Sequence, residues 1–263
     1  MTAATTRARN AERRMPLIEH LLELRKRLVR AVLGIIAGGV GGWFLNDLVL
    51  NALRNPLITN NARDPGRSAI NFTGITSAFD VKFEIAIVLG VVISSPIWLY
   101  QIFAFLTPAF TRTERKYIFG FFFSAVPLFL IGCAAGWLLV PHIVQLMTGF
   151  AGQRDTTLID AKTYLDFVLR LVLVIGVAFV LPVFLVLLNF LGVLRARAIL
   201  KGWRIAILVT VVFTALATPS ADVISMLLLA MPLIALYFGS VGVAFVHDRR
   251  VDKRADAAVT AGL

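Results

Sequence analysis

Two carboxylates stand among cations beside apolar segments of the chain. Glu23 lies in HLLELRKRL, the stretch from His20 to Leu28, and Glu114 lies in TERK, which follows an apolar run ending near Leu106. A carboxylate accepts two parallel hydrogen bonds from a planar guanidinium. Two separated carboxylates can therefore hold two neighbouring arginines of one peptide, so these residues offer the chemistry of recognising paired basic groups.

Both acids also have a purely structural interpretation. Glu23 and Arg27 are one helical turn apart, and an ion pair at that spacing stabilises a helix by only about 0.3–0.5 kcal/mol. The sequence Thr111-x-x-Glu114 has the pattern of a capping box at a helix start. Spacing alone favours the ion pair for Glu23 and leaves both interpretations of Glu114 open.

The elements that must position these acids are strongly apolar. The chain has 263 residues, of which 59% are hydrophobic and 16% are charged, and its mean hydropathy is +0.84. Apolar blocks of about 20 residues suit helices that cross a bilayer, because in lipid each backbone group must be satisfied within its own segment. The sequence predicts an all-α polytopic membrane protein with six transmembrane helices, near Val29–Leu45, Phe83–Leu106, Tyr117–Val140, Tyr164–Leu191, Ile205–Ala217 and Val223–Val246.

Small residues and prolines shape these predicted helices. Gly34, Gly38 and Gly42 recur every four residues and favour a packing seam with a neighbouring helix. Four prolines inside predicted helices favour kinks and a concave bundle; they are Pro96, Pro127, Pro182 and Pro232. The fifth helix barely spans, so we expect a hollow on the outer side with Asp222 at its rim.

The distribution of lysine and arginine predicts the orientation. Of these residues, 19 flank the membrane on the side of the N terminus and 5 on the opposite side. The positive-inside rule then places both termini in the cytoplasm, as expected of a multi-pass protein of the bacterial plasma membrane. Three regions follow: a cytoplasmic segment over residues 1–28, a six-helix transmembrane domain over residues 29–246, and a charged cytoplasmic tail over residues 247–263.

The N-terminal segment is amphipathic. Leu17, Leu21, Leu24 and Leu28 form one stripe of a helix, which predicts a helix lying on the cytoplasmic membrane surface. Arg25 falls at the edge of this stripe, where its guanidinium can reach lipid phosphate.

Several functional classes are disfavoured. The net charge of +11 is spread over membrane-flanking segments, so we expect contact with anionic lipid and no binding of nucleic acid. Motifs of the HExxH or GxSxG type do not occur in the sequence, and the histidines are scattered at His20, His142 and His247. We therefore expect no enzyme activity, metal or cofactor, and a secondary transporter of a small solute is the alternative function.

The chain resembles the TatC family of the twin-arginine protein translocase from about Pro16 to Asp248. The motifs that carry the resemblance occur in the expected order. They are HLLELRKRL, Pro56, SSPIWLYQIFAFLTPAF over Ser94–Phe110, TERK, and ATPSADVIS over Ala217–Ser225. The resemblance implies a signal-peptide receptor in a complex that exports folded proteins, with TatA-like and TatB-like single-span partners and self-association of the receptor.

The resemblance also implies roles for particular residues. Two acidic positions of the family's signal-peptide site match Glu23 and Glu114, and we add Arg25, Gln101 and Phe105 as further candidates for that site. Asp222 and Thr214 are the candidates for contact with partner helices.

The chain departs from the family at one position. Family members often carry an acidic or polar residue shortly before the proline of helix four, and this chain has Val180 there. What replaces it stays open among Asn189, Thr210 and Thr214.

Overall fold

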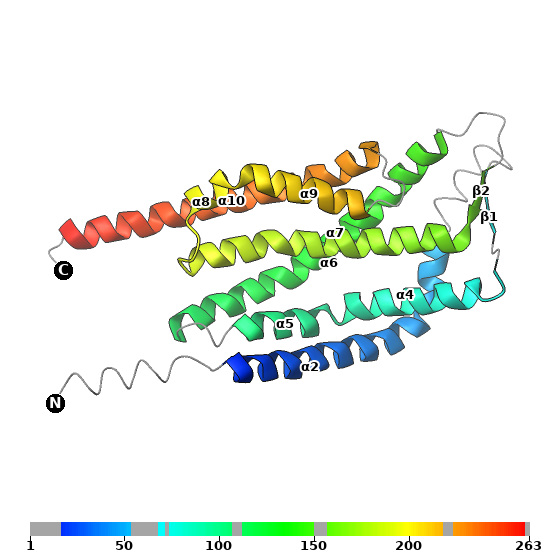
Figure 1. Ribbon diagram of the computed structural model, residues 1–263, viewed down its shortest axis with the longest axis horizontal. Helices are drawn as coiled ribbons and strands as arrows, with labels where there is room; N and C mark the ends of the chain where they lie inside the picture. Colours follow the sequence, from blue (N-terminus) through cyan, green and yellow to red (C-terminus); the bar gives the residue numbers. More distant parts are fainter. Residues whose placement is uncertain are drawn as a thin grey trace.

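Helices dominate the computed structural model, which describes residues 17–53, 68–71, 74–106, 112–149, 157–217 and 223–260. Residues 46–53 are also helical. The labelled elements, in chain order, are α2 (Leu17–Phe44), β1 (Ser68–Asn71), α4 (Ser77–Ile93), α5 (Ser95–Leu106), α6 (Arg112–Gly149), β2 (Thr157–Asp160), α7 (Ala161–Phe190), α8 (Ala196–Lys201), α9 (Trp203–Ala217) and α10 (Val223–Thr260) (Figure 1).

The helices account for the six predicted spans. Among the described residues, α2, α6, α7 and α10 are each long and apolar enough to cross a bilayer. Helices α4 and α5 qualify as one span bent by 55° at Ser94, next to Pro96. Helix α9 has only 15 residues, about 22 Å at the helical rise, so it is the short fifth segment that the sequence predicts. The predicted fold class, a helical polytopic membrane protein, is confirmed.

The N-terminal helix differs from the expectation of a separate surface helix. Helix α2 runs from Leu17 to Phe44 without a break. No proline interrupts it, and the exposed stripe of Leu21, Leu24 and Leu28 continues along the helix into its apolar part. The amphipathic stretch is therefore continuous with the first candidate span, and its place at the cytoplasmic membrane surface stays a prediction.

The predicted glycine seam is present and joins α2 to α4. A Cβ atom added at Gly38 would lie 2.7 Å from the carbonyl oxygen of Gly90, and one at Gly42 would lie 2.9 Å from that of Ala86. Cβ atoms do not approach backbone so closely, so the helices can meet at this distance only because side chains are absent.

Helix α7 lies in the middle of the bundle and packs against α4, α6, α9 and α10 (Figure 1). Its contact with α6 is also close, because a Cβ atom at Gly132 of α6 would lie 2.8 Å from the side chain of Phe179. Most of the core consists of aliphatic and aromatic side chains from α4 to α7. The centre of the bundle is therefore largely apolar, and the buried hydroxyl groups of Ser94 and Ser95 lie at the bend between α4 and α5.

A short parallel β-pair, which the sequence did not predict, lies at one end of the bundle. β1 pairs with β2 in the register Ser68 with Thr157 and Asn71 with Asp160. The Asp160 carboxylate then caps α7 by accepting a hydrogen bond of 2.9 Å from the Thr163 amide. The pair ties together the loops that lead into α4 and α7.

A carboxylate holds α8 at the opposite end. Asp248 of α10 accepts hydrogen bonds of 2.8 Å from the Ala196 backbone amide and from the buried Asn189 side chain. The Asn189 amide group also donates to the Leu194 carbonyl at 2.8 Å. The turn between α7 and α8 is thereby fixed to α10.

The close contact between α2 and α4 leads to a prediction about the stability of glycine variants. In Gly38→Ala the new methyl group meets the Gly90 backbone, so we expect destabilisation by about 1–3 kcal/mol from overpacking. Gly41→Ala is the matched control, because a Cβ atom there has nothing within 4 Å and the gain in helix propensity is the same. Thermal unfolding of the purified protein in detergent measures both. Equal melting temperatures for the two variants would contradict the seam.

Candidate functional site

The start of α2 packs along the end of α5. The His20 ring stacks on Phe105 with ring centroids 4.4 Å apart. Further along the pair, a Cβ atom at Gly34 would lie 2.8 Å from the Ile97 side chain, so the two helices run antiparallel. These two contacts bracket Glu23 and Arg27 on α2 and Gln101 on α5.

Glu23 forms the expected helical ion pair, but the pair uses only one carboxylate oxygen. Oε1 accepts from Nη2 of Arg27 at 2.5 Å and from Nε at 3.0 Å. The two side chains are partly shielded, at 22% exposure for Glu23 and 20% for Arg27. The other oxygen, Oε2, is buried and has no hydrogen-bond donor among the described residues.

Gln101 presents a second acceptor of the same kind. Its Oε1 atom is buried and also lacks a donor among the residues that the structure describes. Buried acceptors in proteins are nearly always paired. A guanidinium has five N–H donors and no acceptor. Because Glu23 and Gln101 lie between the same two helix contacts, the arrangement suits an additional cationic donor group at this level of α2 and α5.

Glu114 begins the next helix at the same end of the molecule. It lies in the first turn of α6, and the start of α6 lies beside the end of α5 and near the start of α2 (Figure 1). The capping-box partner Thr111 lies outside the described residues. The role of Glu114 therefore stays a prediction.

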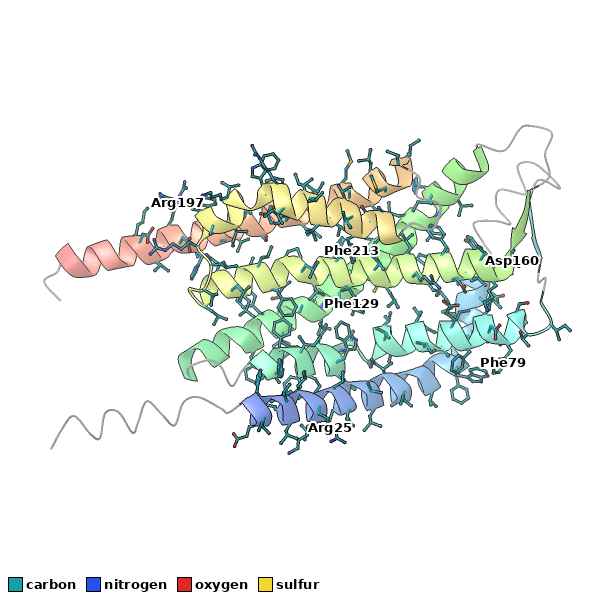
Figure 2. The ribbon with its side chains drawn as sticks, viewed as in Figure 1. Arg25, Phe79, Phe129, Asp160, Arg197 and Phe213 are labelled. Atoms are coloured by element: carbon teal, nitrogen blue, oxygen red, sulfur yellow. The ribbon has the colours of Figure 1, made fainter. Side chains whose placement is uncertain are left out.

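The remaining candidates for this site differ in position. Phe105 is half-buried against His20. The sequence did not lead us to predict this ring contact, although His20, Glu23 and Arg27 share one helical face. Arg25 is exposed and lies on the side of α2 that faces away from α5 (Figure 2). Residues two apart on a helix do not share a face, so Arg25 is not brought together with Glu23.

Of the two partner-contact candidates, the structure describes only Thr214, which is buried. Thr214 is only 2% exposed, and its hydroxyl donates to the Thr210 and Val211 carbonyls of its own helix. Asp222 lies outside the described residues. Both assignments stay predictions, and the outer rim expected at Asp222 is not tested.

The opposite end of the bundle carries ion pairs that the sequence did not reveal. Lys162 of α7 lies 3.1 Å from the Asp80 carboxylate of α4, and Lys82 lies 3.4 Å from Asp47. Lys162 lies in the first turn of α7, and its partner Asp80 is 82 positions earlier, so periodicity gives no sign of the pair. These ion pairs connect helices at this end of the bundle.

Val180, where the family often has a polar group, is 3% exposed in the apolar core. Of the three candidate replacements, Thr210 and Thr214 bond their own helix backbone. Asn189 binds Asp248 and the Leu194 carbonyl near α8. Which of these three residues substitutes for a polar group at Val180 stays open.

Comparisons with known proteins agree with the sequence motifs. The family described as Sec-independent protein translocase protein (TatC) matches residues 19–232. A TatC protein of Xylanimonas cellulosilytica is 44% identical over 96% of this chain and 91% of its own length, and one of Rothia mucilaginosa is 36% identical over 93% and 84%. A crystal structure of a twin-arginine translocase receptor, TatC, superposes with a TM-score of 0.76 at 25% identity, covering 86% of this chain and 99% of the other. The chain belongs to the TatC family of Sec-independent protein translocase proteins.

Proposed function

We propose that the chain is the membrane receptor for twin-arginine signal peptides and the core subunit of a complex that exports folded proteins. Family membership supports the general role. The observation that carries the specific site is the pair of buried acceptors, Glu23 Oε2 and Gln101 Oε1, that lack donors among the described residues.

The internal ion pair and peptide binding are compatible. Arg27 occupies Oε1 of Glu23 and leaves Oε2 for a second guanidinium, and Gln101 Oε1 is the acceptor that we propose for the remaining N–H groups. At an effective dielectric near 20, a charge pair about 4 Å apart interacts by about 4 kcal/mol before desolvation. A lysine ammonium lacks the planar fork that serves two acceptors at once, so the site favours arginine.

Glu114 provides the second half of the proposed site. A pair of consecutive arginines on an extended peptide needs two separated carboxylates, and the starts of α2 and α6 lie at one end of the bundle (Figure 1). The first arginine binds at Glu23 and the second at Glu114 in this proposal. Phe105 and His20 close the side of the site next to Glu23.

The orientation that this function requires agrees with the charge distribution. The end that carries the starts of α2 and α6 also carries α8 and the end of α10, where lysine and arginine concentrate. We propose that this end faces the cytoplasm of a bacterium, where signal peptides arrive. Its cations repel unmatched basic peptides and attract anionic lipid.

As a translocase component, the chain works in a complex with other subunits. We propose TatA-like and TatB-like single-span proteins as partners, together with self-association of the receptor. The outward face of α9 offers an apolar surface for a partner helix, with exposed side chains at Ile205, Leu208 and Val212. The transporter alternative has no support from the family, and the proposal includes no enzyme activity or cofactor.

The first prediction concerns the two acids. Glu23→Ala and Glu114→Ala should each weaken binding of an arginine-pair peptide at least about tenfold, because each removes one charge-assisted pair. Peptide titration against the purified receptor measures the affinity, and membrane abundance should not change. Glu19→Ala is the control, because Glu19 is an exposed acid one turn earlier on α2. Unchanged affinity in both test variants would refute the site.

A second prediction concerns Gln101 and arginine selectivity. Gln101→Leu keeps the side-chain size but removes the acceptor. Affinity for the Arg-Arg peptide should fall about ten- to hundredfold, because one hydrogen bond to a charged group, worth about 1.5–3 kcal/mol, is lost. Affinity for a Lys-Lys peptide should change much less. The ratio of the two affinities is the readout, and equal losses for both peptides would show that Gln101 does not select arginine.

A third prediction separates partner contact from peptide binding. Asp222→Ala should leave peptide affinity unchanged and reduce the amount of single-span partner that copurifies with the receptor. Loss of peptide binding in this variant would contradict the division of roles.

A further inference from the structure

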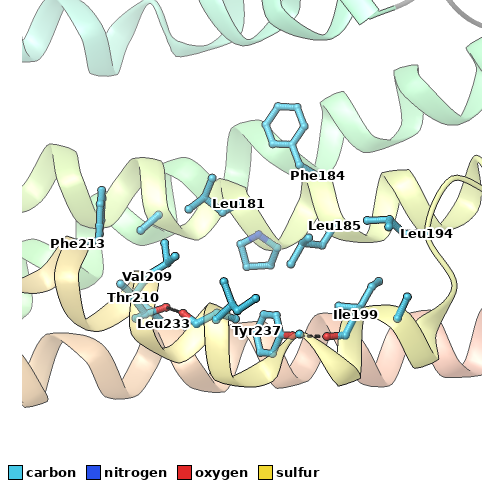
Figure 3. A pocket seen from close by; sticks show the side chains of 16 residues that line it. Leu181, Phe184, Leu185, Leu194, Ile199, Val209, Thr210, Phe213, Leu233 and Tyr237 are labelled. Atoms are coloured by element: carbon cyan, nitrogen blue, oxygen red, sulfur yellow. Dashed lines mark hydrogen bonds between the residues drawn. The ribbon is translucent and has the colours of Figure 1, made fainter.

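An apolar groove lies between α7, α8, α9 and α10. Its volume is about 500 Å³, and its walls include Phe184, Leu185, Val209, Phe213 and Leu233 (Figure 3). The exposed side chains of Leu181, Ile205 and Val209 lie along it, so the groove borders the surface of the bundle.

The hydroxyl groups in the groove wall are already bonded within the protein. Tyr237 donates to the Ile199 carbonyl at 2.5 Å, and Thr210 donates to the Ala206 carbonyl at 2.8 Å (Figure 3). Such a wall offers little to a polar solute, whereas a hydrocarbon chain needs no hydrogen bonds.

The length of the groove fits the acyl chain of one leaflet. From Gly202, just before α9, to Phe213 the groove extends about 16 Å at the helical rise, which is close to half of the roughly 30 Å hydrocarbon core. The groove is therefore long enough to hold the acyl chain of a lipid in one leaflet.

Three cationic side chains lie at the α8 end of this groove. Arg197, Lys201 and Arg204 are all exposed on α8 and the first turn of α9, next to the wall residues Ala198, Gly202 and Ile205. The Arg204 guanidinium lies 5.6 Å from the ring centroid of Trp203, a residue type that favours the level of lipid head groups.

The carboxylate that contacts α8 does not neutralise these cations at the groove. Asp248 accepts from the Ala196 amide and from Asn189, and the three cations Arg197, Lys201 and Arg204 outnumber this single carboxylate. The end of the groove therefore keeps a positive charge at head-group depth.

We propose that this groove is a binding site for an anionic phospholipid, with one acyl chain between α7 and α9 and the phosphate at Arg197, Lys201 and Arg204. The excess of cationic residues at this end of the bundle predicts contact with anionic lipid, and the groove would hold one such lipid. The proposal does not depend on the receptor function. A bound chain there would fill the space between α9 and α7 and so support the short fifth span.

The test uses the full chain in nanodiscs that contain phosphatidylglycerol with a photoreactive group in its acyl chain. Label should appear in peptides of α7 and α9, at least about fivefold above that from phosphatidylcholine with the same chain, since each cation near a membrane surface adds about that factor. Val209→Trp fills the groove at a side chain that is 57% exposed, so the fold is kept, and it should lower the labelling at least about fivefold.

Charge variants test the head-group half of the site. The triple variant Arg197→Gln, Lys201→Gln, Arg204→Gln should reduce phosphatidylglycerol labelling to the phosphatidylcholine level. The matched triple variant Arg249→Gln, Arg250→Gln, Lys253→Gln removes the same charge from exposed positions of α10 and should change nothing. Inorganic phosphate should not displace the lipid.

Three results would overturn the proposal. Equal labelling by both lipids, with no effect of the first triple variant, would remove the head-group site. Labelling that Val209→Trp leaves intact would place the acyl chain elsewhere. Loss of the lipid label when a single-span partner is added, with a crosslink from position 209 to that partner, would show that the groove belongs to a protein.

Discussion

The backbone contact between Gly38 and Gly90 sets where the first helix lies, and the candidate site depends on that position. Because neither residue has a side chain, α2 and α4 approach until a Cβ atom would be only 2.7 Å from a carbonyl oxygen. The same helix then continues along α5 to the stack of His20 on Phe105. That course turns one face of α2 toward α5 and half-buries Glu23. An isolated surface helix would leave this carboxylate in water, where its binding energy would be small.

The contacts that Asp80 and Asp248 make with other helices lie toward opposite ends of the molecule, and the two ends have different roles. At the end with the β-pair, Asp80 and Lys162 connect α4 to α7. At the other end, Asp248 fixes α8 while Glu23 and Gln101 keep acceptors without donors among the described residues. Other buried oxygens among the described residues, such as Oδ1 of Asp166 and Oδ1 of Asn189, also lack a donor. A cationic ligand is therefore indicated by the combination of a carboxylate oxygen of Glu23 with the amide oxygen of Gln101 in one helix contact. The apolar centre, with Val180 inside it, carries none of the proposed recognition.

Much of this arrangement can be predicted from the sequence, because it rests on local patterns. The length of the apolar blocks predicts the spans. The spacing of Gly34, Gly38 and Gly42 predicts the close helix contact, and the four-residue spacing from Glu23 to Arg27 predicts the ion pair. The β-pair and α8 could not be predicted, since elements of four and six residues show no clear period. The link from Asn189 to Asp248 joins residues 59 positions apart, and only the packed bundle brings them together. The free oxygen of Glu23 likewise depends on burial by its neighbours.

The central claim is that Glu23 and Glu114 bind one arginine pair from the same end of the membrane. Photocrosslinking in native membranes, with a photoreactive residue placed beside the arginine pair of the signal peptide so that Glu23 and Glu114 stay intact, tests it most directly. We expect this residue to crosslink to α2 around Glu23 and to the start of α6 around Glu114, and both crosslinks to disappear when Arg-Arg becomes Lys-Lys. Crosslinks to only one of the two helices, or crosslinks that persist with Lys-Lys, would contradict the account.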